Sequence, residues 1–233
     1  MSSRLGDPSL NSITDNSILT EEQKTLLVRF RNSPLREHFY LTGGTALSAF
    51  YLRHRHSEDL DFFTEQEVDL ESVLGFLRAI PHVANIQHER KYDRRLFLLH
   101  DYNQRTMKVE FTKYPFPPLE PRLAVEGVQV DGWRDILANK LMALTDRKDF
   151  KDYLDVYFLL REFPTISLWD AIQQTQRKFG VTGIDHILKG RFLEDLPSQG
   201  ELPMLKPYDP VAIASFYKSL ARELIARSLE KER

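Results

Sequence analysis

Apolar positions in the first half of the chain change repeatedly between helical and strand spacing. A capping-box pattern at Thr20–Gln23 precedes helically spaced apolar residues, which predicts a helix that ends before Pro34. The apolar stretch Phe39–Leu41 predicts a strand, and Gly43-Gly44 predicts a turn that leads into a helix over 46–52. Strand, glycine turn and helix in this order are typical of a segment that cradles phosphate.

Strand spacing dominates the next fifty or so positions. Asp59–Phe63 alternates acidic and apolar residues, which predicts a strand with both aspartates on one face. Asp69 predicts the start of a helix that stops at Pro81. Three further runs predict an antiparallel meander: Val83–Glu89, Leu96–His100 and Thr106–Thr112.

The second half of the chain has helical spacing. Tyr114–Pro121 contains four prolines in eight positions and predicts an extended linker, and Val125–Val130 predicts a short strand or the end of that linker. Beyond Asp131, helices are predicted over 133–144, 153–160, 168–179 and from Asp209 to Leu224. We therefore expect an α+β fold, with a mixed β-sheet lobe and flanking helices over residues 1–121 and an α-helical lobe over 122–233.

Composition narrows the class of protein. Charged residues make up 28% of the chain and the formal net charge is −2, which argues against coating nucleic acid through bulk charge but leaves room for a local basic patch. The absence of cysteine excludes disulfides, thiolate metal sites and a thiol nucleophile. Met1–Pro8 has no apolar core of a signal peptide, and no later run is long enough to span a membrane. A soluble cytoplasmic protein is expected.

Gly43-Gly44 and the pair Asp59 and Asp61 together suggest nucleotide chemistry. A helix that follows the glycine turn would return the two carboxylates to it, where a metal ion would bridge carboxylates and phosphates. Each half of the motif has an alternative. The glycines also suit a tight turn with positive φ, and the aspartates also suit a solvated strand end paired with Arg53 or Arg55.

Glu110 is a third candidate carboxylate. It lies on the predicted strand Thr106–Thr112, where Val109 and Phe111 are expected to point inward and Lys108 and Glu110 outward. If this strand lies beside Asp59–Phe63, the three carboxylates would hold two Mg²⁺ ions, which prefer oxygen ligands. The alternative is an exposed Lys–Glu strand face.

The polar run Arg53-His54-Arg55-His56-Ser57 precedes the aspartates. Two histidines two positions apart invite a zinc site, but the sequence shows no third ligand such as an H-E-x-x-H helix. Contact of Arg55 with phosphate or RNA is one alternative, and a surface turn is another.

A charged cluster occupies residues 140–157. The pairs Lys148–Asp152 and Lys151–Asp155 have the spacing of surface ion pairs on a helix. Lys140 lies on or beside the apolar face of its predicted helix and therefore needs a partner, which a triphosphate would supply. Arg147, two turns further on, would extend the same basic wall.

Three of these motifs in this order resemble the AbiEii/AbiGii toxin family, a nucleotidyltransferase-like group within the DNA-polymerase-beta-type nucleotidyltransferase superfamily. The motifs are Leu41–Leu47, His54–Phe63 and the run from Lys140 through Arg147 to Lys151–Leu160. The resemblance implies a mixed-sheet nucleotidyltransferase lobe followed by a helical lobe, with the nucleotide bound between them.

The resemblance also implies roles for individual positions. Gly43, Gly44 and Thr45 would hold the triphosphate, Asp59 and Asp61 would bind metal and act in catalysis, and Glu110 would take the looser position of a third metal carboxylate. Lys140 would contact phosphate as a catalytic residue, and Asp155 would be the catalytic acid of the helical lobe. Further candidates for substrate binding are Arg55, Ser57 and Arg147.

We therefore expect a nucleotidyltransferase that uses Mg²⁺, or Mn²⁺ in its place, to transfer a nucleoside monophosphate from an NTP to an acceptor hydroxyl. The family relation implies a tRNA-like RNA acceptor and a cognate antitoxin. Three alternatives remain open on the sequence: a metal-dependent nuclease, transfer to a small molecule as in aminoglycoside-modifying relatives, and a non-catalytic protein that binds a nucleotide or a partner.

Overall fold

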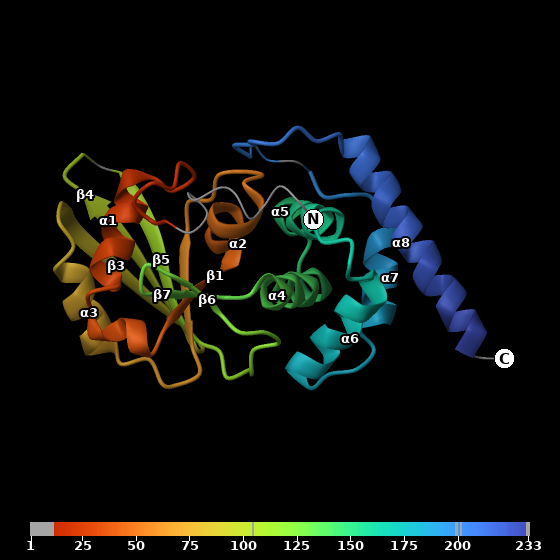
Figure 1. The fold of residues 1–233 in the computed structure, drawn as a ribbon, viewed down its shortest axis with the longest axis horizontal. Coiled ribbons are helices and arrows are strands. Elements are labelled where there is room, and N and C mark those ends of the chain that lie inside the picture. The colour runs from red at the N-terminus through yellow and green to blue at the C-terminus, as the bar shows by residue number, and fades with distance from the viewer. Residues whose placement is uncertain (1–11, 104, 199, 201, 232–233) are drawn as a thin grey trace. The chain divides into compact units, whose positions relative to one another are not determined.

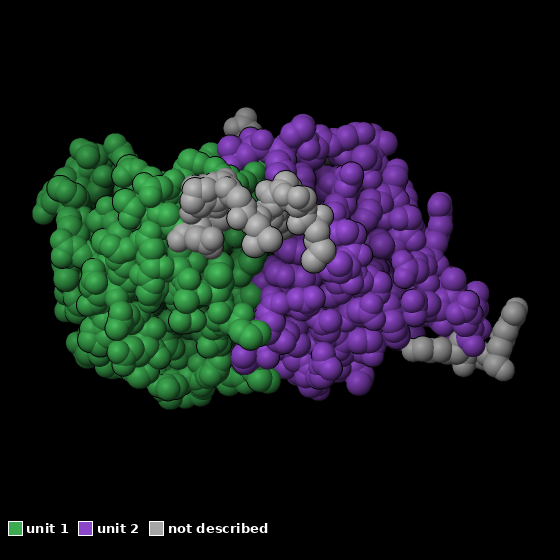
Figure 2. All heavy atoms as spheres, viewed as in Figure 1, with its two compact units in different colours: residues 1–117, 121–132 green, residues 118–120, 133–233 purple. Residues whose placement is uncertain are grey.

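The chain folds as two separately packed sets of elements in a computed structural model that describes residues 12–103, 105–198, 200 and 202–231. Residues 1–117 and 121–132 form unit 1, and residues 118–120 and 133–233 form unit 2 (Figure 2). The segment Met1–Pro8, examined above for a signal peptide, lies outside the described residues. The part of the chain that is described contains no helix long and apolar enough to cross a membrane.

Unit 1 is built on a seven-stranded mixed sheet in the order β3-β4-β5-β2-β1-β7-β6 (Figure 1). Only the pairs β2–β5 and β1–β7 are parallel. The predicted meander is confirmed, because β3, β4 and β5 are consecutive antiparallel neighbours. The strands are β1 (Tyr40–Thr42), β2 (Leu60–Thr64), β3 (Val83–Lys91), β4 (Arg94–Asp101), β5 (Thr106–Lys113), β6 (Leu123–Val125) and β7 (Val128–Val130).

Aromatic contacts place the core on one face of this sheet. Phe62 of β2 stacks on Phe111 of β5 with ring centroids 5.1 Å apart, and Phe30 of α1 lies 4.4 Å from Phe62. Since successive residues of a strand point to opposite faces, Asp61 and Glu110 lie on the other face. The helical segments of this unit are α1 (Glu21–Phe30), η2 (Pro34–Glu37), α2 (Gly43–Leu47), the π-type turn η3 (Ser48–Leu52) and α3 (Leu70–Arg78).

The predicted helix starts of unit 1 are confirmed. Thr20 and Gln23 form both hydrogen bonds of a capping box on α1. The Asp69 side chain accepts a hydrogen bond from the Glu71 backbone N–H at the start of α3. The predicted helix over 46–52 begins earlier, at Gly43, and is less regular, because the α-helix α2 gives way at Ser48 to the π-type turn, which ends at Arg53 in the left-handed conformation.

The regular secondary structure of unit 2 consists of helices among its described residues, apart from a bridge residue at Met204. Four of its helices match predicted ones, and α8 begins at Pro210, where the Asp209 carboxylate accepts a hydrogen bond from the Val211 N–H as expected. The prediction missed α7, although Ile184, Leu188 and Phe192 recur at four-residue spacing and are buried. The helices are α4 (Trp133–Asp146), α5 (Phe150–Glu162), α6 (Leu168–Phe179), α7 (Ile184–Leu193) and α8 (Pro210–Lys231).

Residues 122–132 belong to the sheet. The sequence division assigned them to the second lobe and treated Val125–Val130 as one strand or a linker end. In the structure they form the β6–β7 hairpin, whose turn is Glu126 and Gly127 with φ of 47° and 88°. β7 pairs with β1, so this hairpin completes the sheet of unit 1, and the linker residues 118–120 belong to unit 2.

Candidate functional site

The glycine turn at the end of β1 is approached by three polar side chains. Gly43 has a φ of +75°, and a Cβ atom built on it would lie 2.1 Å from Oδ2 of Asp61. A Cβ on Gly44 would lie 2.6 Å from Nη2 of Arg55 and 2.9 Å from Oγ of Ser57. Gly43 is thus required by its backbone and by the close approach of Asp61, whereas a side chain at Gly44 would displace the ends of Arg55 and Ser57. The structure brings together five sequence candidates at this turn.

Thr45 and Gln23 hold the loop that carries Ser57 and Asp59. The Thr45 side chain is buried, and its hydroxyl donates to the carbonyl oxygens of Ser57, at 3.3 Å, and Asp59. The Gln23 amide donates to the carbonyl oxygens of Ser57 and Glu58 at 2.8 and 3.2 Å. The sequence identified Gln23 only as a helix cap. Both residues position the loop by fixing its backbone.

The carboxylates lie on neighbouring strands. Asp61 of β2 and Glu110 of β5 are register partners in the parallel pair, so the predicted adjacency of these two strands is confirmed. Asp59 directly precedes β2, and its Oδ2 lies 2.7 Å from Nζ of Lys108 on β5. The alternative prediction that Asp59 pairs with Arg53 or Arg55 is therefore wrong, because Asp59 pairs with Lys108. The sequence analysis did not identify Lys108 as the partner of Asp59.

Glu110 is buried, with 4% of its surface exposed, so the expectation of an exposed Lys–Glu face is wrong for this residue. The Arg94 guanidinium donates to both of its oxygens, at 2.9 Å through Nε, and the Thr112 hydroxyl donates at 2.6 Å. A buried carboxylate needs such partners, because burial without them strongly disfavours the charge. Arg94 belongs to the adjacent strand β4.

The polar run before the aspartates is partly buried. His54 and Arg55 have 0% and 4% exposure, and Arg55 donates to the His56 carbonyl oxygen at 3.0 Å. Nδ1 of His56 lies 3.2 Å from the Ile18 carbonyl oxygen. The plain surface-turn alternative is therefore wrong for Arg55, which instead lies against the glycine turn.

The donor atoms favour a site with two aspartates over one with three carboxylates. Among the described residues, no group of three or more His, Asp or Glu side chains is arranged to hold a metal ion. Glu110 is committed to Arg94, whereas Asp59 is one-third exposed and paired with an ammonium group. Carboxylate oxygens suit Mg²⁺, which keeps most of its shell for water and phosphate. Asp59 and Asp61 therefore have the ligand chemistry that such an ion prefers, with Lys108 now occupying Oδ2 of Asp59.

Unit 2 contains a buried ionic cluster formed by four of the charged residues noted above. Nζ of Lys140 lies 2.7 Å from Asp152 and 2.8 Å from Asp155, and both carboxylates are fully buried. Nε of Arg147 lies 2.7 Å from the second oxygen of Asp152. The expected surface pairs are wrong, because Lys148 contacts Glu194 and Lys151 contacts Asp149. The partner that Lys140 needs is present within its own unit.

Asp152 is the electrostatic centre of this cluster. Burial raises the pKa of its carboxyl, but the positive charges of Lys140 and Arg147 and the hydrogen bonds that both donate outweigh burial, so the net pKa is lowered. Asp152 is therefore ionised at neutral pH. Half of the Arg147 side chain is exposed, which leaves it as the solvent-facing member of the cluster.

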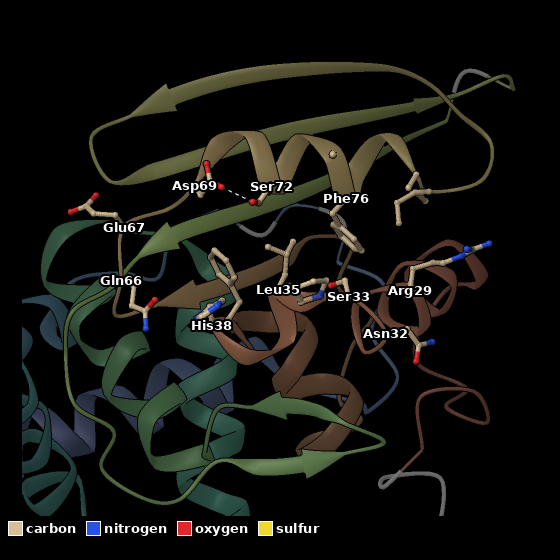
Figure 3. Close-up of a pocket in the computed structure, with 15 residues that line it drawn as sticks. Arg29, Asn32, Ser33, Leu35, His38, Gln66, Glu67, Asp69, Ser72 and Phe76 are labelled. Atoms are coloured by element: carbon tan, nitrogen blue, oxygen red, sulfur yellow. Dashed lines mark hydrogen bonds between the residues drawn. The ribbon is translucent and has the colours of Figure 1, made fainter.

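A cavity of about 640 Å³ lies elsewhere in unit 1, between α1, η2 and α3. Phe76 extends from α3 toward Leu35, and Arg29 and Asn32 line the same space from α1 and the turn after it (Figure 3). None of the site residues expected from the sequence lines it. We therefore locate the candidate site at the glycine turn.

Comparison with known proteins agrees with this geometry. The chain is 34% identical over 148 residues to an uncharacterized protein of Aquifex aeolicus, a match that covers 62% of this chain and 68% of that one. Its fold resembles that of a candidate nucleotidyltransferase from H. pylori, with 21% identity, a TM-score of 0.60 and coverage of 92% and 99% of the two chains.

Helicobacter pylori JHP933 has the same fold, at 19% identity and a TM-score of 0.58, over 94% of each chain. Residues 25–229 match the model of the family described as nucleotidyl transferase AbiEii toxin, type IV toxin–antitoxin system. That match includes the glycine turn, both aspartates and the buried ionic cluster. The chain therefore belongs to the AbiEii family of nucleotidyl transferase toxins.

Proposed function

We propose that this protein transfers a nucleoside monophosphate from an NTP to a hydroxyl group of RNA in a reaction that requires Mg²⁺. Family membership supplies the nucleotidyl transferase activity and implies an NTP substrate and an antitoxin partner. The observation that carries the finer proposal is the convergence of Asp61, Arg55 and Ser57 on Gly43-Gly44. This convergence places a guanidinium, a hydroxyl and a carboxylate around one turn.

The residues at the turn have distinct roles in this proposal. Arg55 and Ser57 bind phosphate oxygens through a charge-assisted hydrogen bond and a neutral one, over a backbone that lacks side chains at Gly43 and Gly44. Asp59 and Asp61 bind Mg²⁺, which when bound neutralises charge on the triphosphate. Thr45 does not contact the triphosphate in this proposal, but fixes the loop behind Asp59.

Glu110 acts as a positioning residue. Its contacts with Arg94 and Thr112 fix the strand beside Asp61, and its loss would leave the Arg94 guanidinium without its bidentate partner. In unit 2, Lys140, Arg147 and Asp155 remain the proposed catalytic and phosphate-binding residues on the resemblance of their motif. Asp155 orients the Lys140 ammonium there, and Arg147 is the cation most accessible to phosphate.

Incubation with labelled NTPs, MgCl₂ and total RNA tests the proposal. Wild-type protein should transfer label to RNA, and Asp61→Asn should lower the rate on the order of 10³-fold, because it removes a metal carboxylate without changing the side-chain shape. Asp195→Asn, at a fully exposed aspartate of unit 2, is the matched control and should retain the wild-type rate.

Three results would contradict the proposal. Wild-type protein that transfers no label in Mg²⁺ or Mn²⁺ would exclude the reaction with RNA. Equal transfer by Asp61→Asn would exclude the assigned site. RNA that becomes shorter rather than labelled would identify a nuclease.

A further inference from the structure

The tip of the β3–β4 hairpin combines two features that each lower stability. Tyr92, at the turn, has a φ of 54° and is 85% exposed. A bulky residue in the left-handed region is an outlier, since only glycine and, to a lesser degree, asparagine adopt it readily. Such strain often accompanies a functional role. Its exposed ring also lacks the packing that would offset the strain.

The second feature is repulsion between the two strands. Arg90 lies directly opposite Arg95, and Lys91 lies directly opposite Arg94. Like charges in cross-strand pairs destabilise a sheet. Three acids lie near these cations: Asp93 is in the turn itself, Glu110 binds Arg94, and Glu67 faces the Arg90 and Arg95 side, where Lys113 already binds its carboxylate. In a chain with a formal net charge of −2, two like-charged pairs at one tip are a local excess of positive charge.

A second hairpin tip in the same sheet provides a contrast. Tyr102, at the turn between β4 and β5, is 78% exposed, but the nearby charges are largely acidic. Arg105 at this tip is paired with Glu22. Exposed tyrosine thus occurs at both tips, whereas like-charged cross-strand pairs of basic residues occur at the Tyr92 tip.

The Tyr92 tip is joined to the candidate site through Arg94. This residue pairs with Lys91 across the hairpin, and its guanidinium binds Glu110, the register partner of Asp61. β3 and β2 are three strand spacings apart, or about 14 Å across the sheet. A few nucleotides of an extended strand cover that span.

We propose that the β3–β4 tip docks a single-stranded segment of the acceptor RNA, with the Tyr92 ring stacked on a base and phosphates bound by Lys91 on one face of the hairpin and by Arg90 and Arg95 on the other. An aromatic ring flanked by basic side chains is the usual platform for single-stranded nucleic acid. The left-handed backbone holds the ring away from the sheet, and bound phosphates relieve the repulsion between the paired cations. The proposal rests on the proposed function only for the statement that this RNA is the acceptor.

Binding of a fluorescein-labelled 15-nucleotide single-stranded RNA, followed by anisotropy at several salt concentrations, tests the docking surface without turnover. Tyr92→Ala should raise the Kd about tenfold, while Tyr102→Ala should leave it unchanged. Arg90→Gln combined with Lys91→Gln should reduce the slope of log K against log salt by about 1.4, at ~0.7 per phosphate contact. Tyr92→Gly should keep the binding defect and raise the Tm, which excludes misfolding as its cause.

Two measurements separate this proposal from the proposed function. If RNA binding depends on Tyr92 but no label is transferred, docking stands and the assigned reaction fails. If label is transferred and Tyr92→Ala binds and reacts with RNA as wild type does, docking is wrong. The same binding measurement with vesicles that contain anionic lipid tests a membrane surface as the ligand. Affinity for vesicles that depends on Tyr92, together with affinity for RNA that does not, would overturn the proposal.

Discussion

Gly43 and Gly44 are glycines for different reasons. Gly43 adopts a left-handed backbone beneath the Asp61 carboxylate, whereas Gly44 makes room for the ends of Arg55 and Ser57. The sequence suggested a turn here because glycine pairs mark turns. It did not indicate which side chains would fill the space, since Asp61 approaches from a strand that follows a helix and a loop.

Gly43→Ala should separate the steric role of this glycine from its backbone role. The new Cβ would displace the Asp61 carboxylate, so nucleotidyl transfer should fall on the order of 100-fold, as misplacement by about 1 Å commonly does. Gly183→Ala is the control, because Gly183 has a similar φ of +78° and open space around it. Both variants should lose about 1–2 kcal/mol of stability from the strained backbone, measured by urea unfolding.

Wild-type activity of both Gly43→Ala and Gly183→Ala would show that Asp61 is not held against the turn. Loss of activity in both would trace the defect to strain alone.

Individual elements differ in how well the sequence predicted them. The helices α1 and α3 have capping residues and the strands β2 to β5 have alternating apolar residues in the sequence, and the structure confirms these elements. β6 and β7 have three residues each, too few for alternation to show, so the pattern predicts a short strand or the end of the linker over Val125–Val130 instead of a hairpin. α7 was missed because Gly183 and Gly190 flank or interrupt a weak apolar repeat.

The candidate site was predictable where its residues are close in sequence. Gly43, Gly44, Asp59 and Asp61 form a local motif, and the structure brings Asp61 to the glycines. The salt bridges Lys108–Asp59 and Arg94–Glu110 depend on the order of strands in the sheet. That order is a tertiary property, so no local pattern indicated these partners.

The loop before β2 is held in part by the Thr45 hydroxyl of α2, and Thr45→Val tests this contribution. Valine keeps the volume but removes the side-chain donor to the Asp59 carbonyl oxygen and leaves the Ser57 carbonyl oxygen with Gln23 alone, so stability should fall by about 1–2 kcal/mol and transfer should also fall. Thr175→Val is the control, since Thr175 is equally buried but donates to Ala171 of its own helix.

Stability from chemical unfolding and label transfer are measured on both variants. Thr175→Val should change only the first. A Thr45→Val protein with full activity would mean that the loop keeps Asp59 in place without this hydrogen bond.

At the scale of the whole molecule, the ionic cluster of unit 2 makes stability depend on pH. The folded-state pKa of Asp152 lies below its ordinary value, so its contribution is present above about pH 4 and is lost as pH falls through the lowered pKa. Wild-type stability should therefore be insensitive to this cluster between pH 7 and pH 5.

Lys140→Met should make the free energy of unfolding depend on pH within this range. It leaves Asp152 and Asp155 fully buried without the ammonium between them, which should cost about 3–5 kcal/mol at pH 7. Arg147 is then the cation left to oppose burial at Asp152, so the folded-state pKa of that carboxyl should rise from its wild-type value and the stability deficit of the variant should shrink as pH falls from 7 to 5. Lys206→Met, at a partly exposed pair with Glu162, is the control.

Urea unfolding across this pH range measures the effect. A loss of stability in Lys140→Met that is the same at pH 5 and pH 7 would show that the missing packing, rather than the unpaired charge, causes it.

The short segment 118–120 has a consequence for how the chain can be divided. These residues belong to unit 2, although the chain then returns to the sheet of unit 1 to form β6 and β7. Leu119 and Glu120 donate backbone N–H groups to the buried Asp135 carboxylate, which also binds Lys178 at 2.6 Å, and Glu120 holds Arg134 at the start of α4. A polypeptide that starts at Trp133 lacks these hydrogen bonds and the ion pair with Arg134. Residues 133–233 alone are therefore not a complete folding unit, and a truncation at that boundary would remove part of their own interior.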